Sequence, residues 1–237
     1  MLQGGYKAVL EARSQEEFSH EIGNFTRAMG FQRFSAITVV DYTLGRSEFI
    51  TIDNCPASFK ESWNDPKLGM SDPVMQHCKR QSVPIVWDQR TYVDHGAGEL
   101  WESQAHYGYR TGVSLALHLP EGRHFVLGMN RNEAMPADPT ELIRLVADMQ
   151  LFAVHALDAA LRLLLPVEQQ LEQPRLRPRE LEVLRWTMDG KTAWEVGGIL
   201  GITERTVVLH LQSAMHKLNC KSKHQAVLKA LRLGLIR

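Results

Sequence analysis

Apolar residues in the first part of the chain recur at helical spacing and then at strand spacing. A capping box, Ser14-x-x-Glu17, precedes apolar positions at i, i+4, i+7 and i+11, which predicts an amphipathic helix over residues 16–29. β-rich runs at residues 34–41 and 48–53 predict a hairpin after this helix. The apolar positions of the helix are Phe18, Ile22, Phe25 and Met29.

Helical and extended segments continue to residue 165. The longest predicted helix covers residues 139–165, and its apolar residues form more than one helical stripe. We therefore expect it to contact its own sheet and a second partner, such as another subunit. Residues 1–165 thus predict an α+β fold, in which helices flank an antiparallel sheet as an α/β/α sandwich. The other predicted elements are helices at residues 56–63, 72–80 and 98–107, an extended segment at 83–87, and strands at 112–119 and 124–130.

Residues 176–237 predict four short helices in a compact module, and the polar residues 166–175 before them predict a linker. Only Gly201-Ile202-Thr203 separates the second helix from the third, which is the joint of a helix-turn-helix. The signals that delimit the helices are Pro178, the capping box Thr192-x-x-Glu195, Gly201, Thr203, the capping box Ser222-x-x-Gln225 and Gly234.

The third of these helices has two usable faces. One face is an apolar stripe, which we expect to be buried. The opposite face carries a cation, an amide and an imidazole, which can reach base edges or phosphates from a major groove. For an isolated helix, a simple solvated face is the competing interpretation. The stripe consists of Val207, Leu211, Ala214, Met215 and Leu218, and the opposite face of Arg205, Leu209, Gln212 and His216.

The distribution of charge favours DNA over a solvated face. The whole chain is neutral, with 27 basic and 27 acidic residues. Residues 174–237, however, hold 12 Lys/Arg and 5 Asp/Glu, a net charge of +7, which leaves −7 on the rest of the chain. A strongly basic small domain in a neutral protein indicates a polyanion partner for that domain alone.

Several functional classes lack their sequence signals. The three cysteines form no C-x-x-C pair and no histidine cluster has metal-ligand spacing, so we expect neither disulfides nor a metal. We find no signal peptide and no apolar run of the roughly 18–20 residues that span a membrane. No nucleophile elbow, zinc-protease motif or phosphate-binding loop is present. We therefore expect a cytoplasmic protein that is not an enzyme and uses no cofactor.

A candidate ligand site lies in residues 55–87, which are rich in aromatic residues outside regular strands. Aromatic rings can bury a small amphiphile, and a carboxylate among them can accept one hydrogen bond that orients it. The competing interpretation is structural: the aspartate caps a helix and the rings belong to the core. The residues concerned are Phe59, Trp63, Asp72 and Trp87.

With both halves considered, the chain resembles the LuxR family of quorum-sensing transcription factors. The resemblance implies a small-molecule (autoinducer-like) binding and dimerisation domain at residues 1–165, a linker at 166–175 and a helix-turn-helix DNA-binding domain at 176–237. It also implies a homodimer on dyad-symmetric, double-stranded promoter DNA. Asp72-Pro73, Pro84, Trp87 and Gly112 match the family's first domain. Glu180, Leu184, Gly190, Lys191, Glu195, Ile199, Leu200, Thr206, Val207, His210, Lys217 and Leu218 match its second.

The implied ligand site departs from the family's pattern, which is Tyr-Pro-x-x-Trp-x-x-x-Tyr followed by Asp-Pro. Cys55 stands at the first tyrosine and Phe59 at the tryptophan, so two hydrogen-bond donors are weakened or lost. Each loss opposite a buried carbonyl costs about 1–3 kcal/mol. The small-molecule signal is therefore expected to differ from a standard acyl-homoserine lactone. The ligand-binding residues that the resemblance implies are Ser35, Cys55, Phe59, Trp63, Asp72, Pro73, Trp87 and Gly112.

The substitutions at Phe59 and Trp63 are similar to those of the plant-associated LuxR solo subgroup, which implies a plant-derived signal. In the second domain, Val208 stands where the family often has a basic residue, so contact with thymine methyl groups is expected there. The DNA-binding residues that the resemblance implies are Lys191, Thr192, Thr203, Arg205, Thr206, Val208, Leu209, Gln212, His216 and Lys217.

Other interpretations stay open at this point. The first domain could be a true acyl-homoserine-lactone receptor, or its pocket could be filled by Phe59, Trp63 and Trp87 in a ligand-independent regulator. A phosphorylation-controlled response regulator shares the second domain, but the first half lacks the alternating βα units of a receiver domain. An enzyme fused to a DNA-binding domain lacks a catalytic motif. Operator sequence and the choice between activation and repression are not encoded in any pattern that we find.

Overall fold

The computed structural model describes residues 2–43, 46–62, 66–119, 122–165 and 174–237. It divides into two compact units. The larger unit is built from residues 1–118 and 123–166, and the smaller unit includes residues 167–237. Most of the predicted linker therefore lies outside the described residues. Within the described part of the chain, no helix combines the length and apolar character needed to cross a membrane.

A five-stranded sheet in the order β2-β1-β5-β4-β3 forms the centre of the larger unit. Strand β1 pairs antiparallel with β2 and with β5, and β3 pairs antiparallel with β4. The predicted hairpin and the two later strands are therefore confirmed, as is the antiparallel sheet. The strands are β1 Arg33–Thr43, β2 Arg46–Asp53, β3 Ile85–Trp87, β4 Thr111–Leu119 and β5 Arg123–Arg131.

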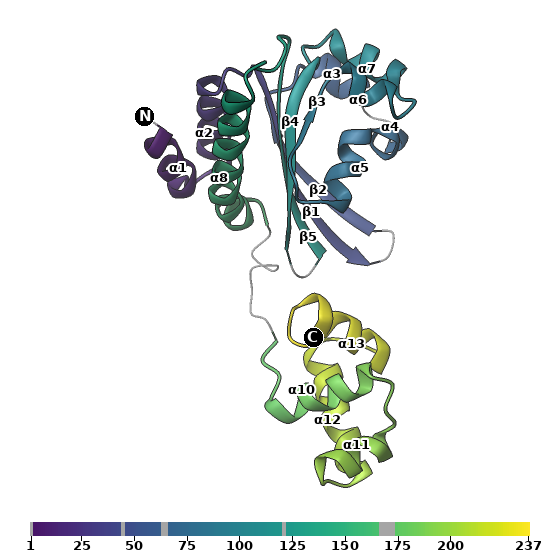
Figure 1. The fold of residues 1–237 in the computed structure, drawn as a ribbon. Helices are drawn as coiled ribbons and strands as arrows, with labels where there is room; N and C mark the ends of the chain where they lie inside the picture. The colour runs from purple at the N-terminus through teal and green to yellow at the C-terminus, as the bar shows by residue number, and fades with distance from the viewer. Residues whose placement is uncertain (1, 44–45, 63–65, 120–121, 166–173) are drawn as a thin grey trace. The chain divides into compact units, whose positions relative to one another are not determined.

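Helices cover both faces of this sheet, as an α/β/α sandwich requires (Figure 1). One face is covered by α1 Leu2–Glu11, α2 Gln15–Ala28 and the long α8 Pro139–Leu164. The short helices between β2 and β4 cover the other face. They are α3 Ala57–Ser62, α4 Pro66–Ser71, α5 Pro73–Arg80, α6 Gln89–Val93 and α7 Gly98–Ala105.

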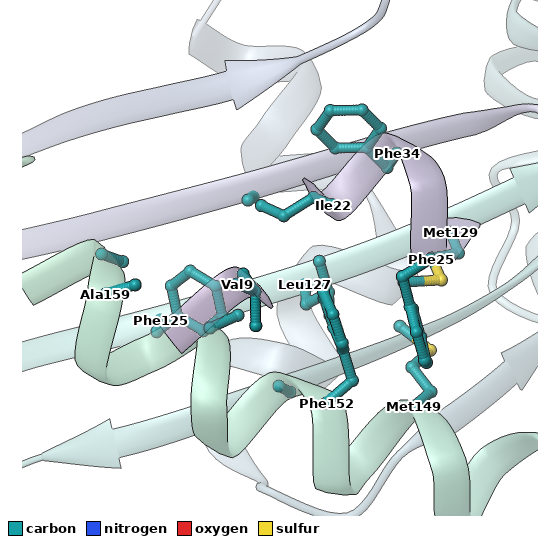
Figure 2. Close-up of a cluster of buried hydrophobic side chains, with 14 of the residues drawn as sticks. Val9, Ile22, Phe25, Phe34, Phe125, Leu127, Met129, Met149, Phe152 and Ala159 are labelled. Carbon is teal, nitrogen blue, oxygen red and sulfur yellow. The ribbon is translucent and has the colours of Figure 1, made fainter. Parts of the chain in front are cut away.

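Alternation along the strands separates the apolar core from the candidate site. Phe34 and Ala36 of β1 belong to the main core with Phe25 of α2 and Phe152 of α8, whose rings stack at 3.8 Å (Figure 2). Because successive strand residues point to opposite faces, Ser35 points away from this core, toward the side of the short helices. The sheet therefore carries a closed apolar core on one face and the candidate ligand residues on the other.

Three helices of the larger unit were not predicted: α1, α4 and α6. Helix α1 contains Gly4 and Gly5, which disfavour an isolated helix, and it has no capping signal that the sequence reveals. Packing supplies its stability, since Val9 is buried in the main core and the Tyr6 hydroxyl donates to Asp148 Oδ1 at 3.3 Å. Arg162 of α8 also donates to backbone carbonyls at the end of α1.

The described residues of the smaller unit form the four predicted helices. Thr192 and Ser222 cap helices as predicted, and Thr203 accepts from the backbone N–H of Thr206 at 3.2 Å. The stripe of the third helix is buried, with Val207 and Ala214 almost inaccessible. The helices are α10 Pro178–Met188, α11 Ala193–Leu200, α12 Glu204–Lys217 and α13 Lys223–Arg232.

Candidate functional site

Asp72 combines the two roles that the sequence left open. It is the N-cap of α5, and its Oδ1 accepts from the N–H groups of Val74 and Met75 at 2.7 and 2.9 Å. Its Oδ2 accepts from the Tyr92 hydroxyl at 3.2 Å, and the residue is only 3% exposed. Three of roughly four acceptor positions of the carboxylate are thus used within the chain. One position on Oδ2 remains, for which the described residues supply no further donor.

Burial shifts the pKa values of both Asp72 and its partner Tyr92. Burial raises the pKa of the Asp72 carboxyl above its ordinary value, while the bonds from Met75, Val74 and Tyr92 oppose that rise. Burial, followed by the charge of Asp72, also raises the pKa of the Tyr92 hydroxyl, which therefore stays protonated and donates. Sequence reasoning missed Tyr92, because nothing local in α6 links it to a carboxylate 20 residues earlier.

Gln104 of α7 is a second polar residue that the sequence did not single out. It is 3% exposed and lies beside the Tyr92 hydroxyl. Its Nε2 nevertheless makes no hydrogen bond of good geometry with the described residues. Buried amides are nearly always satisfied, so this N–H group is a further donor available on the same side of the sheet.

Cys55 lies between two hydroxyl groups. Its Sγ is 2.6 Å from the hydroxyl of Tyr109 and 3.8 Å from Oγ of Ser35. The backbone N–H of Cys55 donates to Asp53 Oδ1 at 2.9 Å, and the same oxygen pairs with Lys60 Nζ at 2.9 Å. The end of β2 and helix α3 therefore hold the backbone of Cys55 in place. Tyr109 is a site residue that sequence reasoning missed, because it follows the end of α7 without any motif.

Phe59 stacks on this group. Its ring is 4.3 Å from the ring of Tyr109 and inclined by only 10°, and Tyr107 contacts it edge-on at 5.4 Å. Offset or edge contacts between rings contribute about 0.5–1.5 kcal/mol beyond burial. Phe59 thus holds the Tyr109 ring in a fixed orientation. Trp63, the other aromatic residue of this segment, lies outside the described residues.

The remaining expected ligand residues pack around Trp87 and the start of α5. The indole N–H of Trp87 donates to Ser114 Oγ at 3.2 Å, and the ring meets Tyr92 edge-on at 5.7 Å. A Cβ on Gly112 would lie 2.6 Å from the backbone oxygen of Met129 and 2.7 Å from the Trp87 ring, so only glycine fits there. Pro73 is the buried first residue of α5.

These residues form one aromatic cluster with polar groups in two places. Asp72 and Tyr92 form one polar point, and Ser35, Cys55 and Tyr109 form the other. Among the described residues, no group of three or more His, Cys, Asp or Glu side chains could hold a metal ion. An apolar site with a few convergent polar groups is suited to binding and orienting a small molecule. The aromatic members are Trp87, Tyr92, Trp101 and Tyr109, with Phe59 and Tyr107 at the margin.

The second candidate site is the exposed face of α12. Arg205, Leu209, Gln212 and His216, which were expected on that face, are all exposed. Leu209 is 56% exposed, and the adjacent Val208 is 37% exposed. Arg205 lies at the start of the helix, and Gln212 and His216 follow one and two turns beyond Leu209. Polar and apolar side chains thus share a single accessible surface.

The turn between α11 and α12 fixes the position at which α12 begins. A Cβ on Gly197 would lie 2.8 Å from the carbonyl oxygen of Ile202, so the close approach of α11 to the turn requires glycine. Thr203 caps α12 and its hydroxyl bonds to that of Thr206 at 2.8 Å. Thr192 caps α11, with its backbone N–H 2.8 Å from Glu195 Oε2. Lys191 is exposed immediately before that cap.

Lys217 occupies a different environment from the other expected DNA contacts. Its Nζ lies 2.9 and 2.8 Å from the two carboxylate oxygens of Glu180, whose side chain is 2% exposed. Burial raises the pKa of Glu180, but the bonds from Lys217, the Arg177 N–H and Ser213 outweigh it and hold that pKa below its usual value. The lysine therefore joins α12 to the start of α10 within the unit.

An exposed apolar surface lies beside the turn and was not anticipated. Trp194 and Ile199 of α11 are 74% and 47% exposed. They line an open depression of about 860 Å³ together with Lys191 and residues of the turn. The signal was present in the sequence, since both residues lie off the buried side of a short helix, but its exposure depends on how α10 and α12 pack.

Comparison with known families agrees with this division. Residues 14–160 match the family described as the autoinducer binding domain. Residues 174–230 match the family described as bacterial regulatory proteins, luxR family. The chain belongs to the LuxR family. As a LuxR-family protein it is a transcriptional regulator that combines a ligand-binding domain with a helix-turn-helix DNA-binding domain.

Curated relatives extend over nearly the whole chain. The transcriptional activator protein SolR of Ralstonia nicotianae is 30% identical over 236 residues, which cover 99% of this chain and 98% of SolR. The transcriptional activator protein AhyR of Aeromonas hydrophila is 28% identical over 220 residues, 91% of this chain and 84% of AhyR. These relatives are regulators, which favours a regulatory over an enzymatic role for this LuxR-family chain.

Solved structures give the same result for the fold. SdiA of Escherichia coli superposes with a TM-score of 0.77 at 26% identity, covering 100% of this chain and 98% of SdiA. A structure of SdiA in complex with octanoyl-rac-glycerol gives a TM-score of 0.75 at the same identity, covering 100% of this chain and 95% of that one. The LuxR-family fold expected from the sequence is therefore confirmed in both units.

Proposed function

We propose that this LuxR-family regulator binds a small amphiphilic signal other than a standard acyl-homoserine lactone on the short-helix side of its sheet. The observation that carries this proposal is the buried Asp72 carboxylate, which keeps an acceptor position beside an aromatic cluster. The chemistry of Cys55 and Phe59 supports a site that is lined differently from a standard lactone site, since neither side chain offers a strong hydrogen-bond donor. The solo-like substitutions at this site make plant-derived small molecules the first signals to test.

The same regulator is proposed to bind double-stranded, dyad-symmetric promoter DNA through α12 as a cytoplasmic homodimer. The exposed side chains of Arg205, Gln212 and His216 would reach base edges and phosphates, and the net charge of +7 over residues 174–237 would draw the unit to DNA. Thr192, Thr203 and Thr206 would contact the backbone at helix N-termini, with Lys191 beside them.

The proposed dimer contact is the outer surface of α8. Ile143, Leu151 and Val154 are 67%, 49% and 53% exposed, although the opposite side of this helix lies in the main core. Large apolar side chains repeated along one exposed helical face are typical of a protein–protein contact. We therefore assign this exposed face of α8 to contact with a second subunit.

Mass spectrometry of molecules that co-purify with the full chain tests the ligand proposal. Wild-type protein is expected to retain a small amphiphile that Asp72→Ala loses, because the carboxylate orients the bound molecule. Asp88→Ala is the matched control, since Asp88 also caps a helix, α6, but is exposed. Equal retention by the wild type and both variants would remove Asp72 from the site.

A standard acyl-homoserine lactone is the second candidate signal. RpaR of Rhodopseudomonas palustris, 31% identical over 88% of this chain, is named a quorum sensing-dependent regulator. Asp72 could accept from the amide N–H of such a ligand. Titration with N-octanoyl-homoserine lactone separates the candidates: tight binding supports the lactone, whereas weak binding beside a tightly bound co-purified amphiphile supports the differently lined site.

A further inference from the structure

We propose that the hydroxyl of Tyr109 is a specificity-determining donor of the ligand site and selects signals that present a carbonyl oxygen beside Cys55. This inference rests on the proposed small-molecule function and names the recognition chemistry of the same site. It concerns a residue without any sequence motif, so only the packing of the sheet and the short helices reveals it.

The position of the hydroxyl is fixed from two sides. The Tyr109 ring is 5% exposed and stacks on Phe59 at 4.3 Å. Its backbone N–H bonds to the carbonyl of Gln104 at 3.4 Å, at the end of α7. A ring held by stacking and by its own backbone keeps its hydroxyl in one direction. That direction is toward Cys55 Sγ, 2.6 Å away.

The partner of this hydroxyl in the chain is a poor one. Sulfur is a weak acceptor and a thiol is a weak donor. A buried hydroxyl gains most from a partner with a strong lone pair, because the low local dielectric strengthens the new bond. If the Cys55 thiol turns aside, a ligand carbonyl oxygen can accept from the Tyr109 hydroxyl in its place, which replaces the sulfur contact with a stronger O–H···O bond. Ser35, 3.8 Å from the sulfur, adds a second hydroxyl at the same point.

The Tyr109 hydroxyl and the Cys55 thiol both stay neutral, as a hydrogen-bond donor site requires. Burial, and then the neighbouring Cys55, raises the pKa of the Tyr109 hydroxyl above its usual value. Burial likewise raises the pKa of the Cys55 thiol, against the bond from Tyr109. At neutral pH the tyrosine therefore keeps its proton to donate. The cysteine stays a thiol, which disfavours a role as a nucleophile.

The polar point formed by Asp72 and Tyr92 defines the second group that a matching ligand should carry. Tyr109 and Tyr92 belong to one aromatic cluster, and Tyr92 bonds to Asp72. A ligand that lies across this cluster meets donors at the Cys55–Tyr109 end and an acceptor at Asp72. The site is thus matched to a small amphiphile that carries a carbonyl group and a separate O–H or N–H group. Acylated glycerols and other hydroxy esters have this combination.

Two probes and two variants test the inference on the full chain. Octanoyl-rac-glycerol carries an ester carbonyl and hydroxyl groups, and octyl glycerol ether lacks only the carbonyl. Tyr109→Phe removes the hydroxyl and keeps the stacked ring. Tyr6→Phe is the matched control, because Tyr6 lies in α1 on the opposite face of the sheet, where its hydroxyl donates to Asp148. Affinities are measured by isothermal titration calorimetry, and thermal melts check folding.

Wild-type protein is expected to bind the ester about 10- to 100-fold more tightly than the ether, since a buried donor loses its acceptor in the ether complex. Tyr109→Phe is expected to abolish that preference, and Tyr6→Phe to keep it. A preference that survives in Tyr109→Phe overturns the inference and leaves the proposed function intact. Equal affinity of the wild-type chain for ester and ether overturns it without any variant. Binding of neither probe, nor of the octanoyl lactone, contradicts the proposed function as well.

Discussion

The two units hold their functional side chains in opposite ways. In the larger unit, Ser35, Cys55, Asp72 and Tyr109 come from four separate segments and lie on one side of a sheet, where they are wholly or partly buried. In the smaller unit, most candidate contacts lie along α12 and its cap, with Lys191 and Thr192 at the start of α11, and nearly all are exposed. Binding and folding are therefore coupled in the first unit and largely separable in the second.

This difference teaches how each unit should respond to substitution. A buried polar group that loses its partner leaves an unsatisfied group behind, so changes in the ligand site affect stability as well as binding. An exposed side chain has water as its alternative partner, so its loss affects binding alone. Lys217 is the exception in the smaller unit, because its partner Glu180 is buried.

Lys217→Met gives the largest expected effect. It leaves the Glu180 carboxylate buried without its cation, which is expected to lower the free energy of unfolding of the smaller unit by about 3–5 kcal/mol. Urea denaturation followed by circular dichroism measures the change. Lys221→Met is the control, since Lys221 is exposed, and should change stability by less than about 0.5 kcal/mol. Equal effects of the two variants would place Lys217 with the exposed cations.

Gly112→Ala gives an intermediate effect and tests the coupling in the larger unit. The new methyl group would meet a backbone oxygen and the Trp87 ring, so a loss of about 2–3 kcal/mol is expected. Differential scanning calorimetry measures it. Gly69→Ala is the matched control in the same unit, because among the described residues no atom beyond its chain neighbours and its own helix backbone lies within 4 Å of the added Cβ. A Gly112→Ala protein as stable as wild type would show that the sheet can yield at this point.

Arg205→Ala gives the smallest expected effect and tests separability. It removes an exposed cation, so affinity for duplex DNA should fall about 10-fold and the salt dependence should weaken by about one counterion. Fluorescence anisotropy over a salt series measures both, and thermal stability should not change. Lys229→Ala, an exposed cation on α13, should leave DNA binding as it is. Loss of stability in Arg205→Ala would contradict the separation of binding from folding.

The part of the fold that sequence predicted best is the part with local signals. The cap at Thr192, for instance, is satisfied by Glu195 three residues later, so its geometry follows from the sequence itself. Helix α1 had no such signal and escaped prediction, because its stability comes from α8, more than a hundred residues away in sequence. Residues 166–173 and Trp63, which the sequence also assigned, lie outside the described part of the chain.

The residues of the candidate ligand site likewise divide into those with a local sequence signal and those without one. Asp72 was accessible to sequence reasoning because Asp-Pro is both a helix cap and a family match. Sequence reasoning could not find Tyr92, Gln104 or Tyr109. Each lies beside a residue that is distant in sequence and that only the packing of the sheet and the short helices brings near. The same holds for Lys217: its position in the helix predicts an exposed side chain, and the sequence does not reveal its bond to Glu180 of α10.

By itself, the sequence determined the alternation of helices and strands, the basic helix-turn-helix and the loss of strong donors at Cys55 and Phe59. These properties depend on periodicity, capping and side-chain chemistry, which act over a few residues. Only the tertiary structure decided that Tyr109 faces Cys55, that Tyr92 supports Asp72 and that Lys217 pairs with Glu180. Each of these contacts joins distant segments, and their positions are set by packing against the sheet or between helices rather than by local sequence.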